Sequence, residues 1–194
     1  MADPPRRVDL NIEQAVIQAS QSENPEVLES LLSQRDEQLL SEAAPSASIP
    51  GIACLLNRIA PRFPRAYQVV LEFSAMAGNS DVFRYVIDRY PDRDLGVDVR
   101  YYAVSGGVEI WKTLLAIQPD FLDEPIGYFG DPLALSVHKE NNTLVAFLLE
   151  RGANVKASNY LGMPVLPYAR KKEGITTETL DLLAKYGAED RIPE

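Results

Sequence analysis

The stretch DPLALSVHKENNTLVAFLLERGANVKA, residues 131–157, contains two amphipathic segments that a polar break separates. Pro132 follows an acidic residue, which is a start signal for a short helix, and apolar residues follow at positions 133, 135 and 137. After the polar run 140–142, a second apolar run ends before Gly152, a residue that commonly closes a helix in a left-handed conformation. The stretch therefore predicts two short antiparallel helices followed by an extended tail.

This predicted helical pair is similar to one repeat of the ankyrin family. The family pattern T-P-L-H-x-A, followed about fifteen residues later by L-L-x-x-G-A-D-V-N-A, aligns with residues 131–157 without a gap. The matching residues are Pro132, Leu133, Leu148, Leu149, Gly152, Ala153, Val155 and Ala157. The residues Asp131, Ala134, Ser136 and Glu140 stand where the family has Thr, His, Ala and a mid-repeat Gly.

Pairs of apolar residues recur along the chain in the same way. They occupy positions 31–32, 86–87, 114–115, 148–149 and 182–183, and the last two intervals are close to the ankyrin period of about 33 residues. We therefore expect an all-α protein, an ankyrin-repeat solenoid of about five helix pairs that forms a single domain over residues 1–194. The first pair is expected at about residues 11–33, with Pro25 opening its second helix.

An irregular insertion is expected at about residues 34–65. The run SEAAPSASIPG predicts a loop, and GIACLLNRIA predicts a short apolar helix that Pro61 and Pro64 end. This helix is interpreted either as an insertion packed on the first two repeats or as a badly decayed repeat. No repeat carries the full T-P-L-H tetrad, so we expect stability to depend on apolar stacking more than on repeated polar ties.

The composition excludes several classes of function. The 194 residues are 46% hydrophobic and carry a net charge of −9, which argues against a nucleic-acid surface. The single cysteine, Cys54, excludes an intrachain disulfide and, with only one histidine, gives no metal-ligand cluster, so we expect no metal and no cofactor. Cysteine usage and the lack of an apolar run of about 18 residues predict a cytoplasmic or nuclear protein that does not enter a membrane.

The ankyrin resemblance implies where a ligand would bind, because such arrays use their hairpin tips and the exposed ends of their first helices. Carried onto this chain, these positions are Tyr128, Phe129, His138, Lys139, Tyr160, Leu161, Met163, Lys171 and Lys172. The lysines could steer an acidic segment of a partner protein, and the aromatic residues are typical of binding hot spots. The alternative is that the lysines form a solvated face and the aromatic residues pack on neighbouring tips.

Two functions follow from these patterns. The first is a non-enzymatic interaction protein, an adaptor, inhibitor or complex subunit that binds another protein through its concave face and tips. The second is a small enzyme or carrier for an apolar metabolite, with His138, Asp131 and Tyr102 as the acid–base groups for isomerisation or cyclisation. An enzyme predicts one deep pocket lined by aromatic residues, whereas a binding array predicts an open groove. Trp111 is predicted to be a core residue, and Tyr102 is predicted either to push neighbouring helices apart or to turn outward.

Overall fold

The computed structural model describes residues 25–90, 94–156, 158–159 and 161–190, and for residues 25–29 and 31 it describes the backbone alone. These ranges form an all-α structure without strands, with one isolated bridge between Ser158 and Pro164. The α-helices are α2 (Pro25–Ala43), α3 (Ile49–Ile59), α4 (Ala66–Ala77), α5 (Ser80–Arg89), α6 (Val97–Gly106), α7 (Val108–Ile117), α8 (Pro132–His138), α9 (Asn142–Glu150), α10 (Val165–Ala169) and α11 (Thr177–Lys185). Two 3-10 helices, η1 (Pro119–Leu122) and η2 (Gly127–Phe129), lie between α7 and α8.

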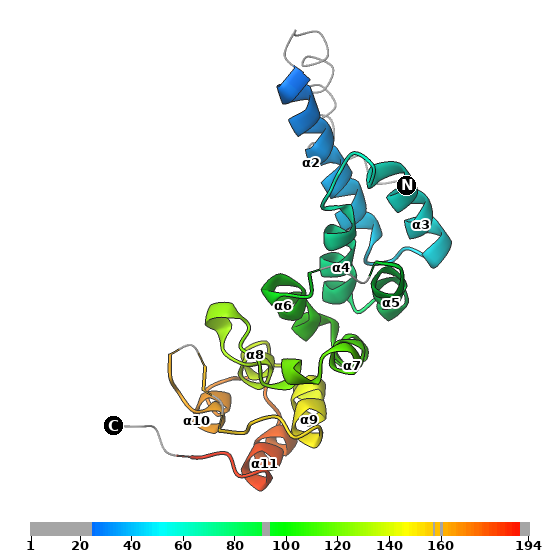
Figure 1. The fold of residues 1–194 in the computed structure, drawn as a ribbon. Helices are drawn as coiled ribbons and strands as arrows, with labels where there is room; N and C mark the ends of the chain where they lie inside the picture. Colours follow the sequence, from blue (N-terminus) through cyan, green and yellow to red (C-terminus); the bar gives the residue numbers. More distant parts are fainter. Residues whose placement is uncertain (1–24, 91–93, 157, 160, 191–194) are drawn as a thin grey trace, which may run out of the picture.

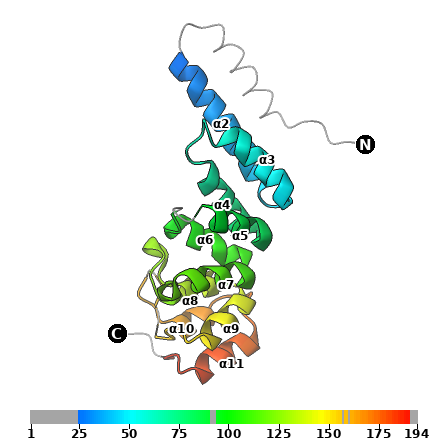
Figure 2. The same cartoon turned by 45° about the vertical axis from the view of Figure 1, so that its right-hand side comes forward.

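The helices form two rows. In the first row α2, α4, α6, α8 and α10 contact one another in chain order, and in the second row α3, α5, α7, α9 and α11 do the same. Each helix of the first row also contacts the helix that follows it in the chain. Figures 1 and 2 show these pairs following one another from α2 and α3 at one end of the molecule to α10 and α11 at the other.

The amino-terminal part differs from the expectation in the length of its helix. Pro25 opens α2 as predicted, but the helix continues to Ala43, through part of the segment that was expected to be a loop. Leu40 and Ala44 are buried at helical spacing, so their burial favours continued helix over the Ser- and Ala-rich loop. Residues 11–24, the rest of the expected first pair, lie outside the described residues.

The short apolar helix of the expected insertion is present as α3. Its residues Ile52, Leu56 and Ile59 are buried, and Ser48 caps its start by accepting a hydrogen bond from Gly51 N. Because α2 packs on α4 and α3 packs on α5, these two helices occupy the places of a helix pair. α3 is thus paired with α2, whose first half was expected to be the second helix of the first pair, and residues 34–65 do not form a separate unit.

A continuous apolar core runs between the two rows. Trp111 is buried, as predicted, and so are Leu114, Leu148 and Leu149 from the recurring apolar positions. Tyr102 is half-buried and does not push α4 and α6 apart. These two helices approach so closely that a Cβ atom at Gly106 would lie 2.9 Å from the carbonyl carbon of Ala75.

Stability was expected to depend more on apolar stacking than on repeated polar ties, and asparagine side chains provide two such ties between successive helix pairs. Asn79 Nδ2 donates to the carbonyl oxygens of Ala44 and Ala47, both at 3.1 Å. Asn141 Nδ2 donates to the carbonyl oxygen of Val104 at 2.8 Å. The side-chain oxygens of both asparagines also cap the second helix of their own pair. The side-chain amide of each asparagine thus connects the start of that helix with a backbone carbonyl of the preceding pair.

The described part of the chain contains no helix that is both long enough and apolar enough to cross a membrane.

Candidate functional site

Four aromatic side chains from the first-row helices α4 and α6 and from the 3-10 helix η2 lie next to one another, and we call this row the aromatic strip. It consists of Phe73 on α4, Tyr102 and Tyr101 on α6, and Phe129 on η2. The ring centroids are 6.1 Å apart between Phe73 and Tyr102, 5.7 Å between Tyr102 and Tyr101, and 4.6 Å between Tyr101 and Phe129. All four rings are partly exposed, so the strip presents aromatic surface to solvent.

The helical geometry of α6 explains why its two tyrosines lie at the edge of the core. Val99 and Ala103 are buried at a spacing of four residues and define the face of α6 that packs inward. Arg100 and Val104 are buried too and widen this face. At about 100° per residue, Tyr102 then flanks Val99 on one side of the buried face and Tyr101 flanks Val104 on the other. Each ring therefore packs along one side and remains exposed along the other.

Lys139 lies at the end of α8 and contacts the strip. Its Nζ donates to the Tyr101 hydroxyl at 2.8 Å and lies 4.6 Å from the centre of the Tyr101 ring. This contact joins the turn between α8 and α9 to α6, across 38 residues of sequence. Among the described residues, no carboxylate lies within ion-pair distance of Lys139.

His138 is paired with a tyrosine of the next first-row helix. Its Nδ1 lies 2.6 Å from the Tyr168 hydroxyl, and the two rings are nearly parallel. Burial lowers the pKa of His138, the positive charges of Lys172 and Lys139 lower it further, and Glu140 opposes them. The imidazole is therefore mostly neutral at pH 7, and its tautomer decides whether Nδ1 or the tyrosine hydroxyl donates the hydrogen bond.

Lys172 lies beside the same tyrosine. Its Nζ is 3.7 Å from a carboxylate oxygen of Glu140 and 5.7 Å from the centre of the Tyr168 ring. Lys171 is exposed and makes no ion pair with any residue that the structure describes. Lys139, Lys171 and Lys172 follow the carboxyl ends of α8 and α10, where positive side chains also stabilise the helix dipole.

A polar groove of about 480 Å³ lies next to Lys139. Its walls are the end of α6, with Ser105, and the turn and first residues of α9, with Asn141, Asn142 and Thr143. Glu140, in the same turn, has a φ of 57°, an uncommon conformation for a residue with a side chain. Because Lys139 lines the groove and also contacts Tyr101, the groove lies beside the aromatic strip.

The tips that precede α8 and α10 carry apolar side chains into solvent. Tyr128 is 93% exposed, Leu161 is 67% exposed and Phe129 is 41% exposed. Met163 is half-buried, and Tyr160 lies outside the described residues.

Glycines bring neighbouring tips together. A Cβ atom on Gly127 would lie 3.2 Å from Val97 at the start of α6, and one on Gly130 would lie 3.0 Å from the carbonyl oxygen of Ser158. The tips of successive pairs thus form one ridge beside the strip.

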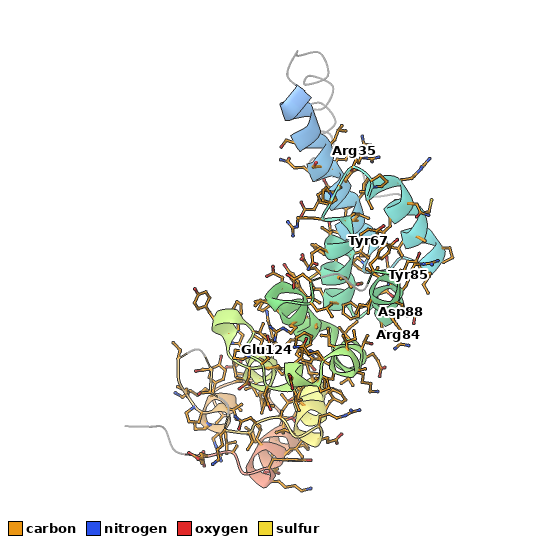
Figure 3. All side chains as sticks on the ribbon, in the orientation of Figure 1. Arg35, Tyr67, Arg84, Tyr85, Asp88 and Glu124 are labelled. Carbon is orange, nitrogen blue, oxygen red and sulfur yellow. The ribbon has the colours of Figure 1, made fainter. Side chains whose placement is uncertain are left out.

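Arg100 positions the tip before α8. Its buried side chain donates to the carbonyl oxygen of Glu124 at 3.2 Å and to the Glu124 carboxylate at 3.0 Å. Its guanidinium also lies 4.7 Å from the centre of the Phe121 ring. These contacts anchor on α6 the segment that leads to Tyr128 and Phe129; Glu124 is labelled in Figure 3.

The expected binding residues are therefore brought together in part. Phe129 and Lys139 both contact Tyr101, and His138 and Lys172 both contact Tyr168. Tyr168 was not among the expected site residues. Its separation of 30 residues from His138, close to the repeat interval, was the available signal.

The three residues proposed for acid–base chemistry are each engaged elsewhere. His138 pairs with Tyr168, and Tyr102 stacks in the strip. Asp131 caps α8 by accepting a hydrogen bond from Ala134 N at 2.9 Å, and burial raises its pKa to about 6. No group of three or more possible metal ligands occurs in the described ranges.

A second groove, of about 340 Å³, lies between α5 and α7 in the second row. It is lined by Arg84, Ile87 and Asp88 from α5 and by Lys112 and Ile117 from α7, among others. Figure 3 shows Arg84 and Asp88 on α5, at the right of the view. This groove lies between second-row helices, whereas the strip crosses first-row elements.

No protein-family model matches the chain, and a search of curated proteins finds no significant match to it.

Proposed function

We propose that this protein is a degenerate ankyrin-like solenoid that binds another protein through the aromatic strip and the neighbouring tips. The alternating contacts within two helix rows and the match of residues 131–157 to the ankyrin pattern support the proposed architecture. An array of this kind presents one continuous surface along its first row. The strip occupies that surface.

The observation that carries the proposal is the row of four partly exposed aromatic rings from α4, α6 and η2. Tyrosine and phenylalanine bury a large area on binding and lose few rotatable bonds, which is why aromatic residues dominate binding hot spots. The exposed Tyr128 and Leu161 extend this apolar surface onto the tips. Exposed apolar side chains that lie next to one another favour a surface for a partner over a merely solvated face.

The enzyme alternative predicts a different cavity. A site for an apolar metabolite would be lined by aromatic residues and would include titratable groups. The groove beside Lys139 is instead lined by Ser105, the residues Lys139 to Thr143, and Val104, none of which is aromatic. We therefore favour protein binding over catalysis as the function of this protein.

Site-specific photocrosslinking tests this function. A photoreactive phenylalanine analogue replaces Phe129 in the full chain, expressed in its native source. The matched control carries the same analogue at Ile117 on α7, since these two side chains are 41% and 47% exposed. We expect a discrete protein adduct from position 129 that position 117 does not give.

The adduct must also depend on the strip. Tyr101→Ser, introduced together with the crosslinker at position 129, is expected to reduce its yield by about tenfold, since one hot-spot side chain commonly contributes that much to affinity. Equal adducts from positions 129 and 117, or none from position 129, would contradict the proposal. A metabolite that co-purifies in place of a protein would favour the enzyme alternative.

A further inference from the structure

The ammonium group of Lys139 has no carboxylate partner among the described residues and is held by the ring and the hydroxyl of Tyr101. Some cations are paired with carboxylates, for example Arg62 with Asp36 and Lys112 with Glu109. Arg89 and Arg151, like Lys139, lie over aromatic rings instead. The charge of Lys139 is therefore available to a bound molecule.

Two lysines and one carboxylate lie near His138. Lys139 and Glu140 follow it in the chain, and Lys172 follows α10 and lies 3.7 Å from Glu140. Burial is the main cause that lowers the pKa of His138; the charges of Lys172 and Lys139 lower it further, and the charge of Glu140 opposes them. Two positive side chains and one negative side chain thus gather at this point, although the whole chain has a net charge of −9.

The groove beside Lys139 offers hydrogen-bond donors as well as charge. Ser105 and Thr143 contribute hydroxyl groups, and Asn142 lies in the same lining. The one acidic residue of the lining, Glu140, lies 3.7 Å from Lys172 and is partly neutralised by it. A carboxylate side chain fits this combination of a lysine and hydroxyl donors.

From these contacts we infer that the partner presents an extended acidic segment, with one carboxylate in the groove beside Lys139 and an apolar side chain on Tyr101 and Phe129. This inference rests on the proposed function, and it specifies the chemistry of the partner.

The geometry also sets the spacing of the two side chains. The Lys139 ammonium and the Phe129 ring each lie 4.6 Å from the centre of the Tyr101 ring, so they are at most about 9 Å apart. An extended chain rises about 3.3 Å per residue, and its side chains point to the same side at every second residue. A carboxylate and an apolar residue separated by one residue therefore match the surface.

Two synthetic peptides test this directly. One repeats Glu-Ser-Phe-Ser, which places Glu and Phe on the same side of an extended chain, and the other repeats Gln-Ser-Phe-Ser. We measure their affinities for the full chain by calorimetry. We expect the Glu peptide to bind about tenfold more tightly than the Gln peptide, and to lose that advantage at about 1 M salt, where the Debye length is about 3 Å.

Charge reversal locates the contact. Lys139→Glu is expected to weaken binding of the Glu peptide about tenfold or more and to leave binding of the Gln peptide within about twofold. The matched control is Lys112→Glu on α7, which makes the same change of charge in the second row and is expected to leave both affinities unchanged.

The outcomes separate this inference from the function on which it rests. Equal affinities for the two peptides, or equal effects of Lys139→Glu and Lys112→Glu, would overturn the acidic partner even if crosslinking at position 129 succeeds. Failure of the crosslinking together with failure of both peptides to bind would overturn the binding function itself.

Discussion

The close contact of α4 with α6 leads to a sharp prediction for Gly106→Ala. Gly106 ends α6 and faces the end of α4, where a Cβ atom would lie 2.9 Å from the carbonyl carbon of Ala75 and 3.1 Å from Gly78 N. The carbonyl oxygen of Ala75 would be nearer still. The neighbours are backbone atoms, which cannot rotate away as a side chain can.

The expected cost follows from this geometry. To accommodate the methyl group, α4 and α6 must separate by roughly 1 Å, and forced backbone shifts of this kind cost about 1–3 kcal/mol, occasionally more. Gly106 does not have a positive φ, so alanine adds no backbone strain there. Alanine favours helix over glycine by at most about 1 kcal/mol, which offsets part of the cost. We expect Gly106→Ala to lower the free energy of unfolding by about 2 kcal/mol.

Urea unfolding followed by circular dichroism measures the effect. The control is Gly51→Ala in α3, where the Cβ atom would make an ordinary 3.4 Å contact with Ser48 Oγ, so helix propensity should make it neutral or stabilising by up to about 1 kcal/mol. A free energy of unfolding of Gly106→Ala within about 0.5 kcal/mol of the wild-type value would refute the predicted clash between α4 and α6. The strip crosses this junction between Phe73 and Tyr102, so the same variant should also weaken binding of the Glu peptide.

Three further predictions concern packing, polar ties and pH. Leu148→Ala removes a fully buried side chain from α9 and should cost about 2–5 kcal/mol in urea unfolding; a variant as stable as wild type would contradict the stacked core. Asn141→Ala removes both the cap of α9 and the bond to Val104 and should cost about 2 kcal/mol, whereas Asn154→Ala, on an exposed side chain, serves as the control. Asp131 has its pKa raised by burial from 3.8 to about 6, so its contribution to stability is greatest below pH 3.8 and is lost as the pH rises through 6. Asp131→Asn keeps a capping oxygen without the charge, so its free energy of unfolding should match that of wild type near pH 4 and exceed it by up to about 3 kcal/mol at pH 7. A difference in the free energy of unfolding that is the same at both pH values would rule out this assignment.

The helical class and many core positions could be predicted from local signals. Pro132 and Gly152 bound the pair of helices in residues 131–157, and the apolar spacing within it selected Leu148 and Leu149, which are buried. These features depend on the 3.6-residue period of a helix and on the conformations open to proline and glycine. Both are properties of a short segment, so they can be read without knowledge of its neighbours.

The end of α2 and the polar ties could not be predicted in the same way. The Ser- and Ala-rich run after Leu39 is typical of a loop, but α2 extends to Ala43 because Leu40 and Ala44 become buried in the core. Asparagine is a residue type that commonly starts a helix, but the second bonds of Asn79 and Asn141 reach carbonyl groups of the preceding pair. Tertiary contacts decide both features.

By itself, the sequence determined that this protein is helical and which residues face inward along most of its helices. The tertiary structure alone decided that Lys139 meets Tyr101 and that His138 meets Tyr168, over separations of 38 and 30 residues. The physical reason is that periodicity specifies the buried face of each helix, whereas the meeting of two side chains depends on how closely neighbouring helices approach. Close packing at small residues such as Gly106 sets that distance.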